Sequence, residues 1–155
     1  MNYIYEKERK MKSKYRKAVF VVVYRTNRNR ILYLLLKRKL HWKGWEFPKG
    51  GVENRESILK SIKREIKEET GQMPANITEQ VINGKFRYDK EYADRKGLIG
   101  QTYQLFSVEI KNKKIKIDNS EHSAYKWLDF DNAFSLLTWP NQKVCLNYVN
   151  KKLMR

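Results

Sequence analysis

Three glutamates on one candidate helix are the residues whose type and spacing could carry chemistry. Glu65, Glu68 and Glu69 lie near the end of a segment, from about Asn54 to Thr70, in which apolar residues recur at helical spacing. Its apolar stripe consists of Ile58, Leu59, Ile62 and Ile66. Projected at about 100° per residue, the glutamates overlap one edge of that stripe. The basic residues project to the far side: Lys60, Lys63, Arg64 and Lys67.

This crowding of carboxylates predicts a site for a divalent cation. Glu65 and Glu69 are one turn apart and are turned partly towards the core, which costs stability unless a cation lies between them. Oxygen ligands gathered on one face suit a hard ion such as Mg²⁺ or Mn²⁺. The alternative is three ordinary surface glutamates, although a solvated helix gains more from glutamate–lysine pairs than from like charges.

Strands on both sides of this helix are expected to position it. The continuous β-branched run from Lys17 to Arg25 predicts a buried strand, and the run from Ile31 predicts its hairpin partner. A loop rich in Gly and Pro, from Leu40 to Gly51, leads to the helix, which Gly71 ends. Further strands are predicted at 77–92, 101–117 and 121–128, and a second helix at 130–137 that continues from Pro140 to Met154. This order predicts an α+β fold with a mixed β-sheet between α-helices.

Composition limits the classes of function. The 155 residues fit one domain, expected at 16–155, preceded by a basic and loosely held arm at 1–15. The formal net charge of +17 favours polyanionic partners and makes RNA a candidate, although many of the lysines could simply solvate the surface. No apolar run reaches the roughly 18 residues that a membrane helix needs. A single cysteine, Cys145, excludes an internal disulfide, and the chain is expected in the cytoplasm.

The spacing of charged residues and glycines around the helix resembles a known motif. The pattern runs from Gly50 through five residues to Glu56, then through seven residues to REIKEETG, which spans Arg64 to Gly71. It resembles the Nudix box at every charged and glycine position, and departs from it at Gln72, where the family prefers an aliphatic residue. The resemblance implies the Nudix fold and metal-dependent hydrolysis of a phosphoanhydride bond.

The same resemblance assigns roles to residues of the motif. It implies that Glu65, Glu68 and Glu69 bind the metal and that one of them activates water. It also implies that the backbone carbonyl of Gly50 joins the metal ligands. Glu56 would pair with Arg64, which orients the acidic face of the helix.

Two longer segments narrow the resemblance. WEFPKGGVE at 45–53 and SEHSAYKWLDFDNAFSLL at 120–137 are similar to the asymmetric diadenosine tetraphosphate hydrolases, with overlap to the RNA pyrophosphohydrolases. This similarity implies that Tyr103 and Tyr125 stack on an adenine, although either could be a core residue. It further implies that Glu121 is an additional metal ligand. Two lysines are candidate phosphate contacts: Lys49 and Lys96.

Three functions follow as hypotheses. The first is Mg²⁺-dependent hydrolysis of diadenosine tetraphosphate to ATP and AMP. The second is removal of pyrophosphate from 5′-triphosphorylated RNA, which the net charge favours. The third, a catalytically silent module that only binds nucleotide or RNA, is disfavoured because no glutamate of the motif is lost. Free nucleoside triphosphates and sugar nucleotides remain open as substrates, and so do a monomer and a homodimer as assemblies.

Overall fold

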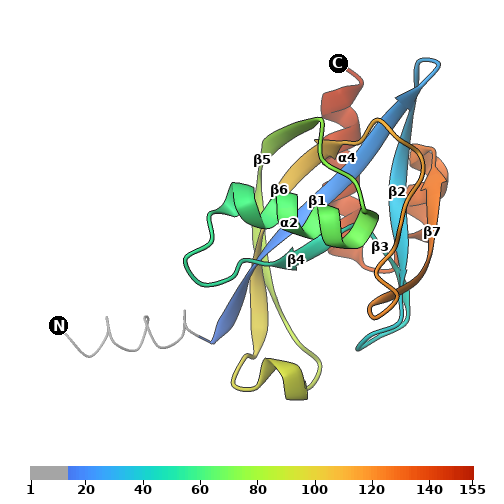
Figure 1. Ribbon diagram of the computed structural model, residues 1–155. Helices are drawn as coiled ribbons and strands as arrows, with labels where there is room; N and C mark the ends of the chain where they lie inside the picture. Colours follow the sequence, from blue (N-terminus) through green and yellow to red (C-terminus); the bar gives the residue numbers. More distant parts are fainter. Residues whose placement is uncertain (1–13) are drawn as a thin grey trace.

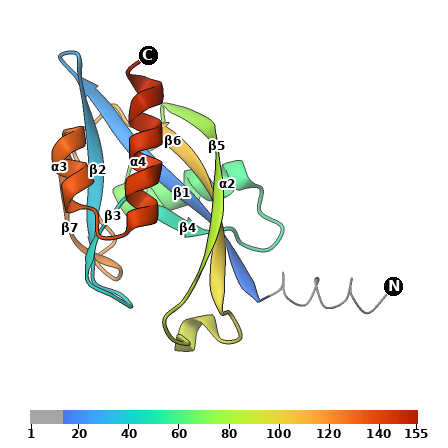
Figure 2. The ribbon, with the colours of Figure 1, turned by 180° about the vertical axis from the view of Figure 1, so that it is seen from behind.

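The computed structural model describes residues 14–155, so most of the arm expected at 1–15 lies outside the described residues. Within this range a seven-stranded sheet is covered by helices on both faces (Figures 1 and 2). The elements, in chain order, are β1 (Tyr15–Asn27), β2 (Arg30–Arg38), β3 (Gly44–Glu46), β4 (Lys49–Gly51), α2 (Ile58–Thr70), β5 (Asn76–Arg87), the 3₁₀ turn η1 (Ala93–Arg95), β6 (Gly100–Glu109), β7 (His122–Leu128), α3 (Phe130–Leu136) and α4 (Pro140–Leu153). Among these helices, none is both long enough and apolar enough to cross a membrane.

The sheet is mixed, which confirms the fold class predicted from the sequence. Its strands follow the order β3-β2-β1-β6-β5, with β4 paired to β1 and β7 paired to β2. The β1–β6 pair is parallel and the other pairs are antiparallel. Helix α2 covers one face, whereas α3 and α4 cover the other (Figure 2).

The central strand β1 explains why its sequence is apolar without alternation. Val19 and Val21 pack in the core layer that contains Ile62 of α2. Phe20 and Val22 point to the opposite face and pack in the layer below α4. Because successive side chains of a strand point to opposite faces, a strand covered on both sides is apolar throughout.

Helix α2 begins later than the sequence pattern indicated. The prediction placed its start near Asn54, but Ser57 is the N-cap, and its hydroxyl accepts a hydrogen bond from the Lys60 N–H at 3.2 Å. The helix ends as expected at Gly71, which has a φ of 74° and donates its N–H to the carbonyl of Lys67 at 2.9 Å. These two caps fix the turn on which each glutamate lies.

Other predicted boundaries were wrong for tertiary reasons. The loop expected at 40–51 contains β3 and β4, and β4 pairs Gly50 with Val19 of β1. The strands expected at 77–92 and 101–117 end at Arg87 and Glu109, because the following chain leaves the sheet. The single C-terminal helix is two helices, since Trp139, which precedes Pro140, has extended backbone angles.

Candidate metal centre and adjoining cleft

Glu69 is the most isolated charged group of the candidate site. It lies on the inner side of α2 with 1% of its surface exposed, and neither carboxylate oxygen has a hydrogen-bond partner. Burial raises the pKa of Glu69 well above its usual value, and the nearby carboxylates of Glu65 and Glu46 raise it further. A buried carboxylate without a donor lacks the compensation that such groups normally have. A divalent cation would supply it.

Glu65 lies one turn earlier and shares this environment. Burial raises the pKa of Glu65 to about 7, although the neighbouring Arg64 guanidinium acts in the opposite direction. A Cβ atom added to Gly50 would overlap the Glu65 carboxyl group, so a larger residue where β4 passes the helix would displace that group. The close approach of Gly50 and Glu65 brings a backbone segment against the acidic edge of α2.

Arg64 holds the acidic edge in place. Its Nε and Nη2 donate to the two carboxylate oxygens of Glu56 at 2.8 and 2.9 Å. Its Nη2 also donates to the carbonyl of Gly51, and its Nη1 donates to Glu65, each at 2.8 Å. The helical projection put Arg64 on the far side with the lysines, but its long side chain curls back to the glutamates. Glu68 is half exposed and accepts from the same Nη1 at 3.3 Å.

Glu121 and His122 approach Glu69 from the start of β7. One candidate ligand atom from each of these three residues lies within 4.8 Å of the others. Glu121 is partly exposed and faces Nη1 of Arg38 at 3.6 Å. His122 is fully buried with its Nε2 2.9 Å from Glu46, while its Nδ1 has no hydrogen-bond partner. Carboxylate oxygens converging on a buried edge form a donor set that fits a hard divalent cation.

A small polar cavity of about 40 Å³ adjoins Gly50, Glu65 and Glu121, and four cationic side chains reach it: Arg16, Arg38, Lys49 and Arg95. Two of them form ion pairs with Glu46, which lies 3.3 Å from Arg38 and 3.3 Å from Lys49. Burial alone would raise the pKa of Glu46, but Lys49, His122 and Arg38 together lower it to about 2. Glu46 is therefore an anion that anchors part of this cationic group.

Arg16 and Arg95 are left without such an anchor. Among residues 14–155, no carboxylate lies within ion-pair distance of either guanidinium. Burial lowers the pKa of Arg16, and the charge of Arg95 lowers it further, so the two cations repel each other. A Cβ atom at Gly51 would overlap the Arg16 guanidinium, which is thus packed against the backbone of β4. Glu65 and Glu121 line the same cavity and attract Arg16 without forming an ion pair with it, so the two guanidiniums are only partly compensated.

A larger cleft of about 410 Å³ continues from this cavity, with which it shares Arg38, Lys49, Arg95 and Gln101. Its aromatic lining consists of Phe20, Trp42, Phe86, Tyr88, Tyr92 and Trp139. Lys49 lies over the rings of Trp42 and Phe86, at 5.8 and 5.9 Å from their centroids. Nε2 of His41 lies 3.0 Å from Asp94 and so joins the segment after β2 to η1. The cleft combines flat apolar surfaces with cations at its inner end.

Comparison with known proteins assigns the chain. The model of the NUDIX domain matches residues 14–148. The chain belongs to the Nudix family. It is 34% identical over 116 residues to the asymmetrical bis(5′-nucleosyl)-tetraphosphatase of Mus musculus, covering 75% of this chain and 76% of that protein. It is 29% identical over 153 residues to the RNA pyrophosphohydrolase of Nitratiruptor sp., covering 91% and 97% of the two chains.

Solved structures agree on the Nudix fold. The chain matches the Ap4A hydrolase binary complex of C. elegans with a TM-score of 0.72 and 23% sequence identity, over 90% of this chain and 98% of the other. The protein is thus a Nudix hydrolase acting on phosphorus-containing acid anhydrides, of the tetraphosphatase or the RNA pyrophosphohydrolase type. Nudix hydrolases generally use divalent metals, in agreement with the donor set around Glu69.

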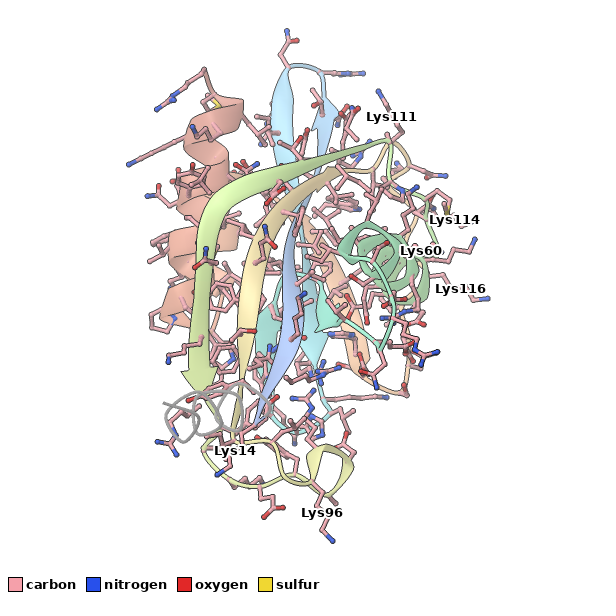
Figure 3. All side chains as sticks on the ribbon, turned by 90° about the vertical axis from the view of Figure 1, so that its left-hand side faces the viewer. Lys14, Lys60, Lys96, Lys111, Lys114 and Lys116 are labelled. Atoms are coloured by element: carbon pink, nitrogen blue, oxygen red, sulfur yellow. The ribbon has the colours of Figure 1, made fainter. Side chains whose placement is uncertain are left out.

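The residues that the sequence indicated for substrate binding in this Nudix hydrolase do not lie together in one cavity. Tyr103 stacks on Phe20, with ring centroids 4.0 Å apart, and is half buried in the layer below α4. Tyr125 is exposed on β7, and neither tyrosine is among the residues that line the 410 Å³ cleft. Lys49 lines both cavities, whereas the exposed Lys96 points away from the body of the molecule (Figure 3).

Several residues that line the Nudix cleft or the small cavity beside it were not selected from the sequence: Arg16, Trp42, Tyr88, Tyr92, Arg95 and Trp139. Aromatic residues within charged loops, such as Tyr92 in EYADRKG, were the available indication. Large rings in polar loops often bind ligands rather than build a core. No comparable pattern marks Arg16, which is one basic residue among many near the start of β1.

Proposed function

We propose that this Nudix hydrolase cleaves diadenosine tetraphosphate asymmetrically into ATP and AMP, with Mg²⁺ or Mn²⁺ as its cofactor. The proposal rests on the order in which the cleft, the cations and the acidic edge of α2 follow one another in space. An aromatic cleft opens, through a group of four cations, onto the acidic edge of α2. A nucleobase, a chain of phosphates and a site of hydrolysis follow one another in the same order in a dinucleoside polyphosphate.

The metal would be held by carboxylates of α2 together with groups from β4 and the start of β7. We assign Glu65, Glu68, Glu69 and Glu121 as its carboxylate ligands, with the carbonyl of Gly50. A divalent cation in such a place supplies neutralisation of phosphate oxygens and activation of water. The unpartnered carboxylate of Glu69 is the feature of the chain that supports this assignment.

Side chains of the protein would accept the proton of the attacking water and would hold the carboxylates in position. One of the three α2 glutamates accepts the proton of the attacking water. Arg64 acts as a positioning residue, because its paired hydrogen bonds to Glu56 hold the guanidinium that orients Glu65. A loosely held carboxylate would spend less time at the attacking distance.

Arg16 and Arg95 would bind the phosphate chain. These two half-buried guanidiniums have no ion-pair partner and repel each other, and a polyphosphate would offset that repulsion when it binds. Lys49 lies beside them, already paired with Glu46, and would contact a further phosphate. Lys96 lies farther out and would act only through long-range attraction of the substrate.

The nucleobase would lie in the aromatic cleft. Stacking on an aromatic ring contributes about 1–3 kcal/mol per base and tolerates any base. Trp42 and Tyr92 line the cleft from two different loops, and Trp139 lines it from the N-cap of α4. Tyr103 would contribute indirectly, because it stacks beneath Phe20, a lining residue.

The test is product identification. Purified protein with millimolar Mg²⁺ and diadenosine tetraphosphate is expected to yield ATP and AMP in equal amounts, resolved by anion-exchange chromatography. Reactions in EDTA and with the Glu69→Gln variant serve as controls. Formation of two ADP molecules, or no cleavage at all, would contradict the proposal.

Removal of pyrophosphate from 5′-triphosphorylated RNA is the second candidate. Two observations favour it: the formal net charge of +17 and the nearly full-length match to an RNA pyrophosphohydrolase. Values of kcat/KM measured for this RNA and for the dinucleotide, with the same enzyme and metal, decide between the two. A higher value for the RNA would make the dinucleotide the secondary substrate.

A further inference from the structure

Lysines from two separate segments meet on the outer side of α2. We call these six residues the lysine face: Lys60, Lys63 and Lys67 of α2, and Lys111, Lys114 and Lys116 of the segment that follows β6. All six are exposed, and Figure 3 shows four of them, Lys60, Lys111, Lys114 and Lys116, on one side of the molecule. Lys111 pairs with Glu109 at 3.2 Å. For the other five, no carboxylate of residues 14–155 lies within ion-pair distance.

The two segments are held together by contacts of their own. The N–H of Lys116 donates to the carbonyl of Thr70 at 2.9 Å, and the side chain of Gln72 donates to the carbonyl of Lys114 at 2.7 Å. Ile115 is buried in the core layer beneath α2. The segment is therefore fastened at the C-terminal end of the helix, with its lysines exposed. Gln72, the departure from the Nudix motif, makes one of these contacts.

Apart from the pair of Lys111 with Glu109, these lysines form no ion pair within the described protein. Lys60, Lys63 and Lys67 follow one another at three and four residues, so their charges repel along one stripe of the helix. The glutamates that could pair with them are turned away: Glu65 and Glu69 are buried on the inner side. Each ammonium is a strongly hydrated point charge that suits a phosphate group and lacks the fork that reads base edges.

We propose that the lysine face binds the phosphate backbone of single-stranded RNA without sequence preference. The same helix carries the acidic edge on its inner side, so the lysine face and that edge belong to opposite sides of one element. The choice of RNA rests on the proposed polyphosphate site, but the binding itself needs no hydrolysis. No aromatic side chain belongs to the face, so its affinity comes from charge and falls steeply with salt.

The experiment measures affinity for a labelled 20-nucleotide single strand with a 5′-hydroxyl end, by fluorescence anisotropy in EDTA at several NaCl concentrations. The test variant combines Lys60→Gln, Lys114→Gln and Lys116→Gln. A matched control combines Lys143→Gln, Lys151→Gln and Lys152→Gln on α4, which removes the same charge on the opposite face of the sheet (Figures 1 and 2). Thermal melts and far-ultraviolet circular dichroism verify that both variants fold.

Loss of three phosphate contacts should lower the slope of log affinity against log salt by about 2, since each single-strand contact contributes roughly 0.7. Affinity at the lowest salt should fall by more than about tenfold in the test variant, and much less in the control. Equal losses in both variants would overturn the proposal, because net charge alone would then explain binding. Retention on anionic vesicles without RNA binding would overturn it as well.

These outcomes are separate from those of the proposed function. The RNA strand has no polyphosphate and the buffer has no metal, so neither cleavage nor its absence affects the measurement. Salt-dependent binding by a protein that fails to cleave diadenosine tetraphosphate would reject that hydrolysis and keep the lysine face.

Discussion

The buried carboxylate of Glu65 predicts how stability depends on pH when no metal is present. The pKa of Glu65 is raised from 4.5 to about 7 in the folded protein, with burial as the largest cause. The unfolded chain therefore loses this proton first as pH rises. The free energy of unfolding should fall as pH increases from about 4.5 and should level off above about 7.

The magnitude follows from the size of this shift. Between pH 5 and pH 8.5, a pKa change from 4.5 to about 7 corresponds to a loss of about 2.5 kcal/mol in the free energy of unfolding. The Glu65 side chain is 10% exposed, so solvent screening reduces this value little. For a chain of this length the loss corresponds to a melting temperature lower by roughly 5–10 °C.

The assay compares thermal melts of the wild type and the Glu65→Gln variant in EDTA over that pH range. Glutamine keeps an oxygen that can accept the hydrogen bond from Arg64, but it does not titrate. The difference between the two proteins reports the Glu65 carboxylate together with its effect on the pKa of Glu69. Adding Mg²⁺ or Mn²⁺ at 100 times its dissociation constant should restore about 2.7 kcal/mol to the wild type. A difference curve that is flat, or that rises with pH, would refute the reasoning.

Three further substitutions test the site. Glu69→Gln should reduce turnover on diadenosine tetraphosphate by about a thousandfold while leaving the fold intact, and unchanged turnover would remove this residue from the mechanism. Gly50→Ala should weaken the metal-induced rise in melting temperature, because the new Cβ displaces the Glu65 carboxyl group; an undiminished rise would show that this approach is unimportant. Arg16→Gln should raise KM for the tetraphosphate about tenfold with a small effect on kcat. The control, Lys17→Gln at the exposed neighbouring residue, should change neither value appreciably. Equal effects of the two substitutions would indicate that Arg16 only attracts the substrate through its charge.

Local features of the site could be predicted because they depend on neighbouring residues. Helical spacing places Glu65 and Glu69 on one side of α2, and Gly71 ends the helix through a backbone conformation that glycine adopts readily. The continuous apolar run of β1 indicated a strand covered on both faces, as observed. The helix start was misplaced because Asn54 and Ser57 are both good N-caps, and the loop contacts of Glu56 with Glu53 and Arg64 decide between them.

Long-range features could not be predicted in the same way. The group of cations joins Arg16 and Arg95, which are distant in sequence and meet because β1 runs parallel to β6, with Tyr15 beside Gly100. The isolation of Glu69 likewise depends on Glu46 and Glu121, which arrive from other segments. Spacing along a helix says nothing about which distant groups surround it.

The sequence by itself therefore determined the family, the acidic helix and the sheet-and-helix architecture. These follow from periodicity and from a motif in which each residue interacts mainly with its neighbours. Only the tertiary structure decided how deeply each carboxylate is buried, which cations lack partners, and which aromatic rings line the cleft. Those properties depend on desolvation and on Coulomb interactions through space, and both are fixed by the packing of segments far apart in the chain.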